Sequence, residues 1–151
     1  KLPKIVSVQN PYNLVNRTYE VGMSEISIRE KVGLLAYSPL AAGYLTGKYR
    51  NNQMPKNSRM DLFYDNYPRY HNERTYKAVD EYFSIAQKYK LSLTQLSQAF
   101  VNSRNFVTSN IIGATTMKQL KENIDSINIS LNQKIMDEIN LIHENIPNPA
   151  P

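Results

Sequence analysis

The chain has 151 residues, of which 41% are hydrophobic and 21% charged, proportions typical of a single globular domain. Its net charge of +5 comes from scattered lysines and arginines without a basic block, which argues against nucleic acid as a partner. The chain has no cysteine, which excludes disulfides and thiolate metal sites, and His71 and His143 are too far apart for a convincing metal site. No apolar run approaches the ~18 residues of a membrane span, and "KLPKIVSVQN" does not have the pattern of a signal peptide, so we expect no membrane partner and a cytoplasmic location.

Strand and helix patterns alternate along the chain. β-branched and apolar runs bounded by Pro, Asn or Gly are typical of buried strands, and apolar residues three or four apart are typical of helices. In chain order, the sequence predicts a strand over 5–8, a helix over 16–31, a strand over 32–37, a long loop over 50–73, helices over 74–89 and 93–104, a strand over 106–114 that can be broken in its middle, helices over 115–127 and 131–144, and an extended tail over 146–151.

Short polar residues mark the expected helix starts, because their side chains accept hydrogen bonds from free N–H groups of the first turn. We expect Asn16 to cap the first helix, Ser92 or Thr94 to cap the helix over 93–104, and Asn132 to cap the last. Before the helix over 115–127, Thr116 is followed three residues later by Gln119, which is a capping-box pattern.

Alternation of strands and helices predicts a parallel sheet, and functional sites of parallel α/β folds lie at the carboxyl ends of the strands. All three predicted strands end in polar, loop-like residues. These tips are Gln9 with Asn10, Tyr37 with Ser38, and residues 113–116. We therefore expect three candidate site loops along one edge of one sheet.

The first two tips offer an amide, a ring and a loop for phosphate. Gln9 suits a carboxamide or a base edge, or it is a solvated strand end. Tyr37 can stack a flat ring on its face, or it is a core tyrosine whose hydroxyl is satisfied by the backbone. Ser38, the backbone around Gly43, and the Lys48 ammonium have the composition of a phosphate cradle, although their spacing matches neither a P-loop nor GxGxxG.

The third tip leads directly into a helix. Gly113, Thr115 and Thr116 precede its first turn, where free N–H groups and the positive end of the helix dipole favour an anion. Capping alone would explain Thr116 and Gln119, but not Gly113 and Asn123 together. Together, the three tips offer a ring stack, an amide and two anion sites, which match the parts of a dinucleotide.

Three segments resemble the aldo-keto reductases, and most of all the Tas-type bacterial branch near the potassium-channel β-subunits. They are "VQNPYNLVNR", "LLAYSPLAAGYLTGKY" and "IIGATTMKQLKENI". The resemblance implies an α/β fold that is the C-terminal part, roughly βα units 6 to 8, of a (β/α)8 TIM barrel, with residues 1–151 forming one partial domain. It also implies NADPH as the cofactor, bound at the C-terminal face of the barrel.

The resemblance assigns cofactor-binding roles residue by residue. Gln9 would hold the nicotinamide carboxamide, and Tyr37 would stack on the nicotinamide ring. The loop beside the pyrophosphate would comprise Ser38, Pro39, Leu40, Ala41, Ala42 and Gly43, with Lys48 near it. The adenosine end would be held by Ser58 and Arg59 and by the pocket of Gly113, Thr115, Gln119, Glu122 and Asn123, with Glu122 on the adenine amino group. The positive charges of Arg59 and Lys118 and the helix dipole favour NADPH over NADH.

The chain departs from the family pattern in its length and in its catalytic residues. A complete (β/α)8 barrel takes about 250 residues, and the family's catalytic Asp, Tyr, Lys and His match no position of this chain. We therefore expect a carbonyl-reducing NADPH-dependent oxidoreductase of which this chain supplies cofactor-binding loops and no catalytic residue. Its partners would be a small carbonyl substrate and either the missing N-terminal barrel half or a second copy. The alternatives are an inactive product of a truncated or split gene, and a non-enzymatic NADPH-binding regulatory module.

Overall fold

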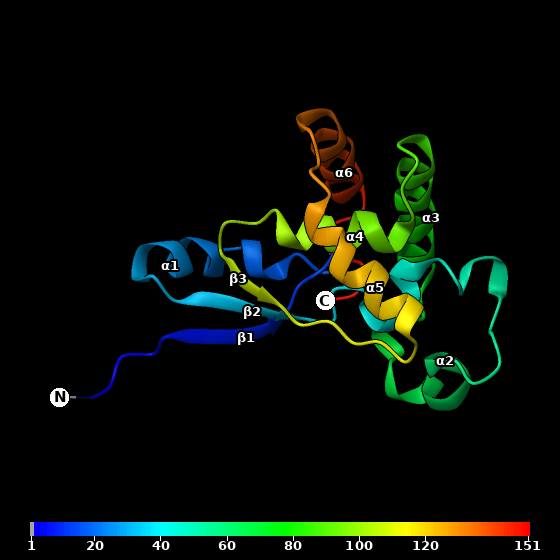
Figure 1. Cartoon of the computed structure of the whole chain (residues 1–151), viewed down its shortest axis with the longest axis horizontal. Helices are drawn as coiled ribbons and strands as arrows, with labels where there is room; N and C mark the ends of the chain where they lie inside the picture. Colours follow the sequence, from blue (N-terminus) through cyan, green and yellow to red (C-terminus); the bar gives the residue numbers. More distant parts are fainter. Residues whose placement is uncertain (1) are drawn as a thin grey trace.

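A computed structural model describes residues 2–151, which form a three-stranded parallel sheet with helices beside it (Figure 1). The strands are β1 (Ser7–Pro11), β2 (Gly33–Tyr37) and β3 (Val107–Asn110), in the order β1-β2-β3. Both pairings are parallel, as the sequence predicts, so all three strands end at the same edge of the sheet.

Two strand boundaries differ from the prediction. β1 lies two residues further along the chain than the β-branched run, and Ile5 and Val6 precede it as exposed residues. β3 ends at Asn110 instead of continuing to residue 114, and its pairing with β2 shifts register between Leu34 and Leu35. The third strand is therefore shorter than predicted, and it does not resume after residue 110.

The predicted helices are present, with one late start. They are α1 (Met23–Glu30), α3 (Glu73–Lys88), α4 (Leu93–Asn102), α5 (Met117–Asp125) and α6 (Gln133–Asn145). The prediction that Asn16 caps the first helix is wrong. Asn16 pairs with Asn13 through the backbone, a 3-10 turn follows, and α1 begins only after Gly22, whose φ of 93° is one that other residues rarely adopt.

The other predicted helix caps are confirmed. The Ser92 side chain caps α4 in a capping box with Gln95, and Asn132 caps α6 by accepting from the Ile135 N–H at 3.0 Å. Thr116 caps α5 by accepting from the Gln119 N–H at 3.2 Å, but the predicted capping box is not formed, because the Gln119 side chain accepts from the N–H of Thr115 instead of Thr116. Each cap satisfies a donor of the first turn and so fixes where its helix begins.

The long loop over 50–73 is more ordered than its sequence predicts. It contains the short helix α2 (Arg59–Phe63) and three 3-10 turns, at Arg50–Asn52, Tyr64–Asn66 and Pro68–Tyr70. Short helical turns of this kind escape a search for periodicity because none is long enough to show a repeat.

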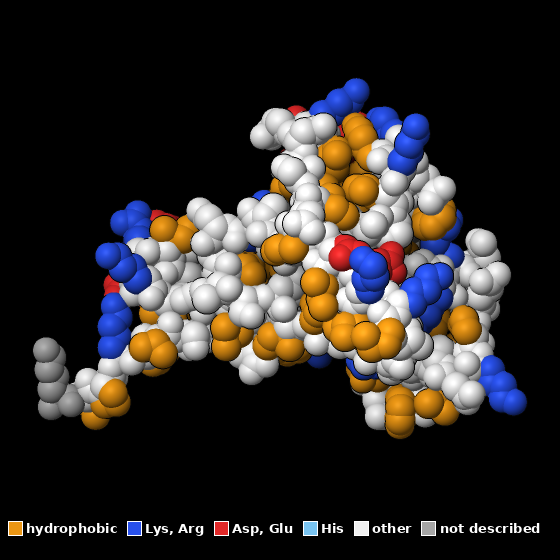
Figure 2. Space-filling view, in the orientation of Figure 1, with side chains coloured by type: hydrophobic (Ala, Val, Ile, Leu, Met, Phe, Trp, Pro, Cys, Tyr) orange, Lys and Arg blue, Asp and Glu red, His pale blue; other side chains and the backbone are white. Residues whose placement is uncertain are grey.

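The core lies between the sheet and α4, which contacts β3, and it extends between α3 and α6, which stand side by side in Figure 1. Leu34 and Ala36 of β2 and Leu96 and Phe100 of α4 are fully buried, as is Ile139 of α6. Figure 2 shows that hydrophobic side chains also reach the surface along the sheet. The helices of the described residues are all too short or too polar to cross a membrane.

The C-terminal tail is docked against the fold and is not a free extension. The Ala150 N–H donates to the Val15 carbonyl at 3.1 Å, and the Pro149 carbonyl accepts from the hydroxyl of Thr75 at 3.2 Å. Ala150 is fully buried. The tail therefore joins the loop after β1 to the start of α3.

Candidate functional site

The ends of β1 and β2 lie side by side. Pro11 pairs with Tyr37 in the parallel register, and the Tyr12 N–H donates to the Tyr37 carbonyl at 3.2 Å. One step further, the Asn13 side-chain amide donates to the Ser38 carbonyl at 2.9 Å. The backbone at Tyr37 and Ser38 is thus held by residues 11–13 at the end of β1. The prediction that Gln9 and Asn10 form the tip is wrong, because β1 continues to Pro11 and these two residues pair with Leu35 and Ala36 inside the sheet.

The loop after Tyr37 has an unusual backbone. Ser38, Ala41 and Ala42 have φ values of 55°, 48° and 54°, and Gly43 has 101°. Left-handed conformations are costly for residues other than glycine, and such strain is concentrated at functional sites. Ala41 and Ala42 are buried, so the strained segment is held by its surroundings. Its tight turns are closed by bonds from the Ala41 N–H to the Ser38 carbonyl at 2.9 Å and from the Gly43 N–H to the Leu40 carbonyl at 2.8 Å.

Gly43 leaves room for the lysine that follows it. A Cβ atom at Gly43 would lie 3.1 Å from Cε and 3.3 Å from Nζ of Lys48. The Lys48 ammonium therefore lies against the strained loop, as the sequence predicts. It forms no ion pair with any side chain of the described residues, so its charge is available to an anion.

The third tip is built around the start of α5. The Gln119 side-chain oxygen accepts from the N–H and the hydroxyl of Thr115, at 2.9 and 3.0 Å, which turns the backbone before the cap. Gly113, Thr115 and Gln119 are exposed, and a Cβ at Gly113 would meet no atom within 4 Å. This tip is therefore open.

Glu122 and Asn123 are already engaged within the chain. A carboxylate oxygen of Glu122 accepts from the Ser92 hydroxyl at 2.5 Å. Asn123 is buried, donates to the Gly113 carbonyl at 3.2 Å and accepts from Gln98 at 3.2 Å. Asn123 thus holds the backbone of the open loop at Gly113 in place.

The remaining predicted residues occupy three different environments. Gln9 is exposed on β1, and Tyr37 has 37% of its surface exposed, so the tyrosine is not a core residue. Ser58 is buried and caps α2, whereas Arg59, the next residue, is exposed and lies over the ring of Tyr67 at 5.9 Å. Within the strained loop, Pro39 is buried and Leu40 is half-buried.

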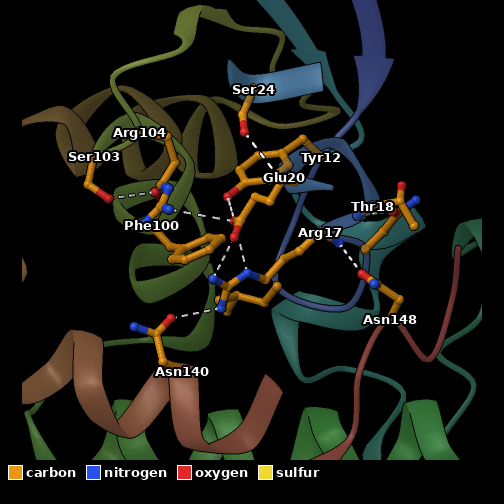
Figure 3. A network of polar contacts seen from close by, with 12 residues as sticks. Tyr12, Arg17, Thr18, Glu20, Ser24, Phe100, Ser103, Arg104, Asn140 and Asn148 are labelled. Atoms are coloured by element: carbon orange, nitrogen blue, oxygen red, sulfur yellow. Dashed lines mark hydrogen bonds and ion pairs between the residues drawn. The ribbon is translucent and has the colours of Figure 1, made fainter. Parts of the chain in front are cut away.

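A polar network beneath the first tip was not singled out from the sequence (Figure 3). Arg17 is buried and donates to both carboxylate oxygens of Glu20, at 2.9 and 2.8 Å, and to Asn140 at 2.9 Å. The hydroxyl of Tyr12, the first residue after β1, donates to Glu20 as well. Burial alone would raise the pKa of Glu20, but the bonds from Arg17 and Tyr12 hold that pKa below its usual range. In the sequence, the only indication of this network is the polar residues of "NPYNLVNR".

Two hollows lie outside the strained loop that follows Tyr37. One, of about 310 Å³, is lined by residues 49–54 and by Tyr44, Tyr64, Tyr76, Val79 and Asp80. The other, of about 420 Å³, lies between β3 and α5 and includes Asn123. No group of three or more His, Asp or Glu side chains that could hold a metal ion occurs in the part of the chain that is described.

Comparisons with known proteins agree on one family. A sequence model described as "Aldo/keto reductase family" matches residues 1–144. The chain is 47% identical to "Protein tas" of Escherichia coli, over 99% of this chain and 43% of that protein. It is 33% identical to the "Probable voltage-gated potassium channel subunit beta" of Oryza sativa subsp. japonica, over 92% of this chain and 44% of that one. Among solved structures, glycerol dehydrogenase AKR11B4 from Gluconobacter oxydans matches with a TM-score of 0.74 and 25% identity, over 94% of this chain and 43% of the other. The chain thus spans less than half the length of these relatives.

Proposed function

The chain belongs to the aldo/keto reductase family, and from this premise we propose that it forms the NADPH-binding part of an oxidoreductase that reduces carbonyl compounds to alcohols. Its three strands would be the sixth, seventh and eighth of a (β/α)8 barrel. The observation that carries the proposal is the register of β1 and β2, with Tyr37 at the shared tip and Lys48 against the strained loop that follows.

The residues present fit a dinucleotide. Tyr37 exposes part of its ring, and an exposed ring can stack on a nicotinamide. Gln9, two residues before the end of β1, offers an amide to the carboxamide group. The space that glycine leaves at position 43 is where the Lys48 ammonium lies, and this cation can pair with a pyrophosphate. When bound, NADPH supplies a hydride for the carbonyl carbon.

The adenosine end would lie between α2 and α5. Arg59 is exposed and forms no ion pair within the described residues, so it can bind a 2′-phosphate. At the positive end of α5, the side-chain NH2 of Gln119 can contribute further donors, whereas the N–H and the hydroxyl of Thr115 already donate to Gln119. Glu122 gives one carboxylate oxygen to Ser92 and keeps the other for the adenine amino group. These features favour NADPH over NADH.

The groups that move a proton to the carbonyl oxygen would come from outside this chain, because none of its residues matches the family's catalytic set. The proposed partners are therefore a small carbonyl substrate and either a polypeptide with the rest of the barrel or a second copy of the chain. The chain matches only 43% of the length of Protein tas, which supports the proposal that a further portion of the barrel is needed. The cytoplasmic location stays a prediction.

A regulatory role is the second candidate. The similarity to a probable potassium channel β-subunit favours an NADPH-binding module without turnover, and a truncated, inactive product would behave in the same way. The two candidates differ in one measurement, since only a reductase oxidises NADPH when aldehydes are added.

The proposal is tested by titrating NADPH and NADH, at fixed salt, into the protein as encoded, with any residues that precede this chain. We expect saturable binding, tighter for NADPH. As a matched control, Lys121→Ala removes an exposed α5 cation that is paired with Asp125, and it should leave both affinities unchanged. Equal affinity for the two nucleotides would refute the 2′-phosphate assignment, and binding of neither would refute the function.

A further inference from the structure

Both cations that the proposed function assigns to phosphates lie over tyrosine rings. The Lys48 ammonium lies 5.1 Å from the ring centroid of Tyr49, and the Arg59 guanidinium carbon lies 5.9 Å from that of Tyr67. Both distances are within the ~6 Å at which a cation is attracted to a ring face. Because neither cation has a carboxylate partner in the described residues, these rings are their defined contacts.

The two rings belong to one continuous stack. Measured between ring centroids, Tyr44 and Tyr70 are stacked at 5.5 Å, whereas Tyr49 lies tilted on Tyr44 at 5.0 Å and Tyr67 lies tilted on Tyr70 at 6.5 Å. These are the separations of interacting aromatic pairs. Tyr44, Tyr49 and Tyr70 are only 5%, 8% and 3% exposed, so the stack is packed on all sides along most of its length. It begins beneath Lys48 and ends beneath Arg59.

A hydrogen bond joins the same two ends by a second route. The Tyr49 hydroxyl accepts from the N–H of Met60 at 3.2 Å, and Met60 follows Arg59 directly in α2. Tyr70 is held on its side by a backbone bond to Tyr67 at 3.1 Å, within the 3-10 turn Pro68–Tyr70. The ring contacts and this hydrogen bond therefore form a closed circuit of contacts. It joins the segment that follows the strained loop to α2 and to the 3-10 turn.

We propose that this circuit, which we call the tyrosine stack (Tyr44, Tyr49, Tyr67 and Tyr70), holds Lys48 and Arg59 at a fixed separation. It thereby selects a ligand that carries two anionic groups at the matching distance. Tyr49 and Tyr70 are positioning residues, and neither has to touch the ligand. The inference rests on the proposed function, since the pyrophosphate and 2′-phosphate of NADPH are the two anionic groups.

The physical reason is entropic. Lysine and arginine have long, flexible side chains, and fixing each of them on binding costs free energy. Cations already held over rings of a rigid stack lose less freedom, and two sites at the right spacing act together as one bivalent site. A ligand with one anionic group gains little from the spacing, because only one cation can hold it.

This difference separates a spacing role from mere packing. If the tyrosine stack only stabilised the loop, breaking it would weaken every ligand of the site alike. If the tyrosine stack sets the spacing of the two cations, breaking the stack lowers the affinity for a ligand with two anionic groups. The affinity for a ligand with one anionic group is then unchanged. NADPH is the first probe, and 2′-AMP, which carries only the 2′-phosphate, is the second.

The test uses three variants of the protein as encoded. Tyr70→Leu breaks the stack, Tyr70→Phe keeps it, and Tyr49→Phe keeps the ring but loses the bond to Met60. Phe106→Leu is the matched control, because it removes a buried ring that packs on Tyr12 at 5.3 Å, outside the stack. NADPH is followed by its fluorescence and 2′-AMP by ligand NMR.

We expect Tyr70→Leu to weaken NADPH about tenfold and 2′-AMP less than about twofold, because only the bivalent contribution is lost. Tyr49→Phe should weaken NADPH about threefold with 2′-AMP unchanged, and Tyr70→Phe should match the wild type. Equal losses for both ligands, or the same pattern in Phe106→Leu, would overturn the inference. If Tyr70→Leu does not fold, Tyr49→Phe decides, and unchanged NADPH affinity in that variant counts against the spacing role.

The wild-type result separates the two levels of the proposal. If NADPH binds no more tightly than 2′-AMP, no bivalent site exists, and the proposed cofactor site is wrong together with the spacing role. If the wild type binds NADPH far more tightly and Tyr70→Leu keeps that difference, only the spacing role is wrong.

Discussion

Replacing Arg17 by methionine is expected to destabilise the fold strongly, because the buried arginine joins the turn after β1 to α6. Its side chain makes three hydrogen bonds of 2.8–2.9 Å, two to Glu20 and one to Asn140. Removing one partner of a buried ion pair costs about 3–5 kcal/mol. Glu20 keeps the bond from Tyr12, an ion pair with Arg104 at 3.7 Å, and a side chain that is 22% exposed. We therefore place the loss of unfolding free energy at the lower end, about 3 kcal/mol.

Urea unfolding followed by circular dichroism at pH 7 measures this loss. The matched control is Arg29→Met, which breaks an exposed pair with Glu25 and should cost no more than about 0.5 kcal/mol. Adding Glu20→Gln to Arg17→Met should restore about 1 kcal/mol, because the unpaired charge is removed. A loss for Arg17→Met as small as that of Arg29→Met would refute the reasoning.

The network also predicts an acid dependence. The bonds from Arg17 and Tyr12 outweigh burial and hold the pKa of Glu20 below its ordinary value of 4.5. A carboxyl with a lowered folded-state pKa stabilises the fold above its unfolded pKa, and this contribution is lost as the pH falls through the folded value. The wild type should therefore lose stability below about pH 4.5 more steeply than Arg17→Met does.

Three further predictions concern the proposed cofactor. Arg59→Ala should weaken NADPH by about 1.5–3 kcal/mol, the range for a charged hydrogen bond, and leave NADH nearly unchanged in parallel titrations. Tyr37→Ala should cost about 0.5–1.5 kcal/mol of cofactor affinity beyond the lost contact area, and unchanged binding would mean that the exposed ring does not stack on the nicotinamide. Gly43→Ala would place a Cβ 3.1 Å from Cε of Lys48 at a φ of 101°, so both NADPH and NADH should bind more weakly by calorimetry, and unchanged affinities would separate Lys48 from the pyrophosphate.

The sequence predicted those parts of the fold that depend on local patterns. The parallel sheet follows from the alternation of apolar runs with helical periodicity, and the caps at Ser92, Thr116 and Asn132 follow from side chains that bond within their own first turn. The contact between Tyr37 and the loop after β1 was also predictable, because parallel strands end at the same edge of a sheet.

Features that depend on distant partners were not predictable. The tail is docked because the Asn148 side chain accepts from the Arg17 N–H at 2.6 Å across 131 residues, and no local pattern encodes such a contact. Asn16 has the residue type of a cap, but its side chain accepts from the Thr18 hydroxyl at 2.8 Å, and Gly22 delays the helix. The tyrosine stack was hidden because its four rings come from two segments that show no periodicity.

The last prediction concerns the isolated chain of 151 residues. In the order β1-β2-β3, both β1 and β3 are edge strands, and each presents unpaired N–H and C=O groups to one side. Apolar side chains flank both edges. Val6, before β1, is 80% exposed, and Ile127, which lines the hollow beside β3, is 66% exposed. We expect the isolated chain to pair edge to edge with a second copy or to aggregate, and to oxidise no NADPH with a panel of aldehydes. Light scattering after size exclusion, with the carbonyl assay on the same fractions, tests both expectations. A stable monomer that reduces an aldehyde would contradict them both. A folded dimer without turnover is the expected result, because pairing would cover the edges while the proposed function places the proton-donating groups outside this chain.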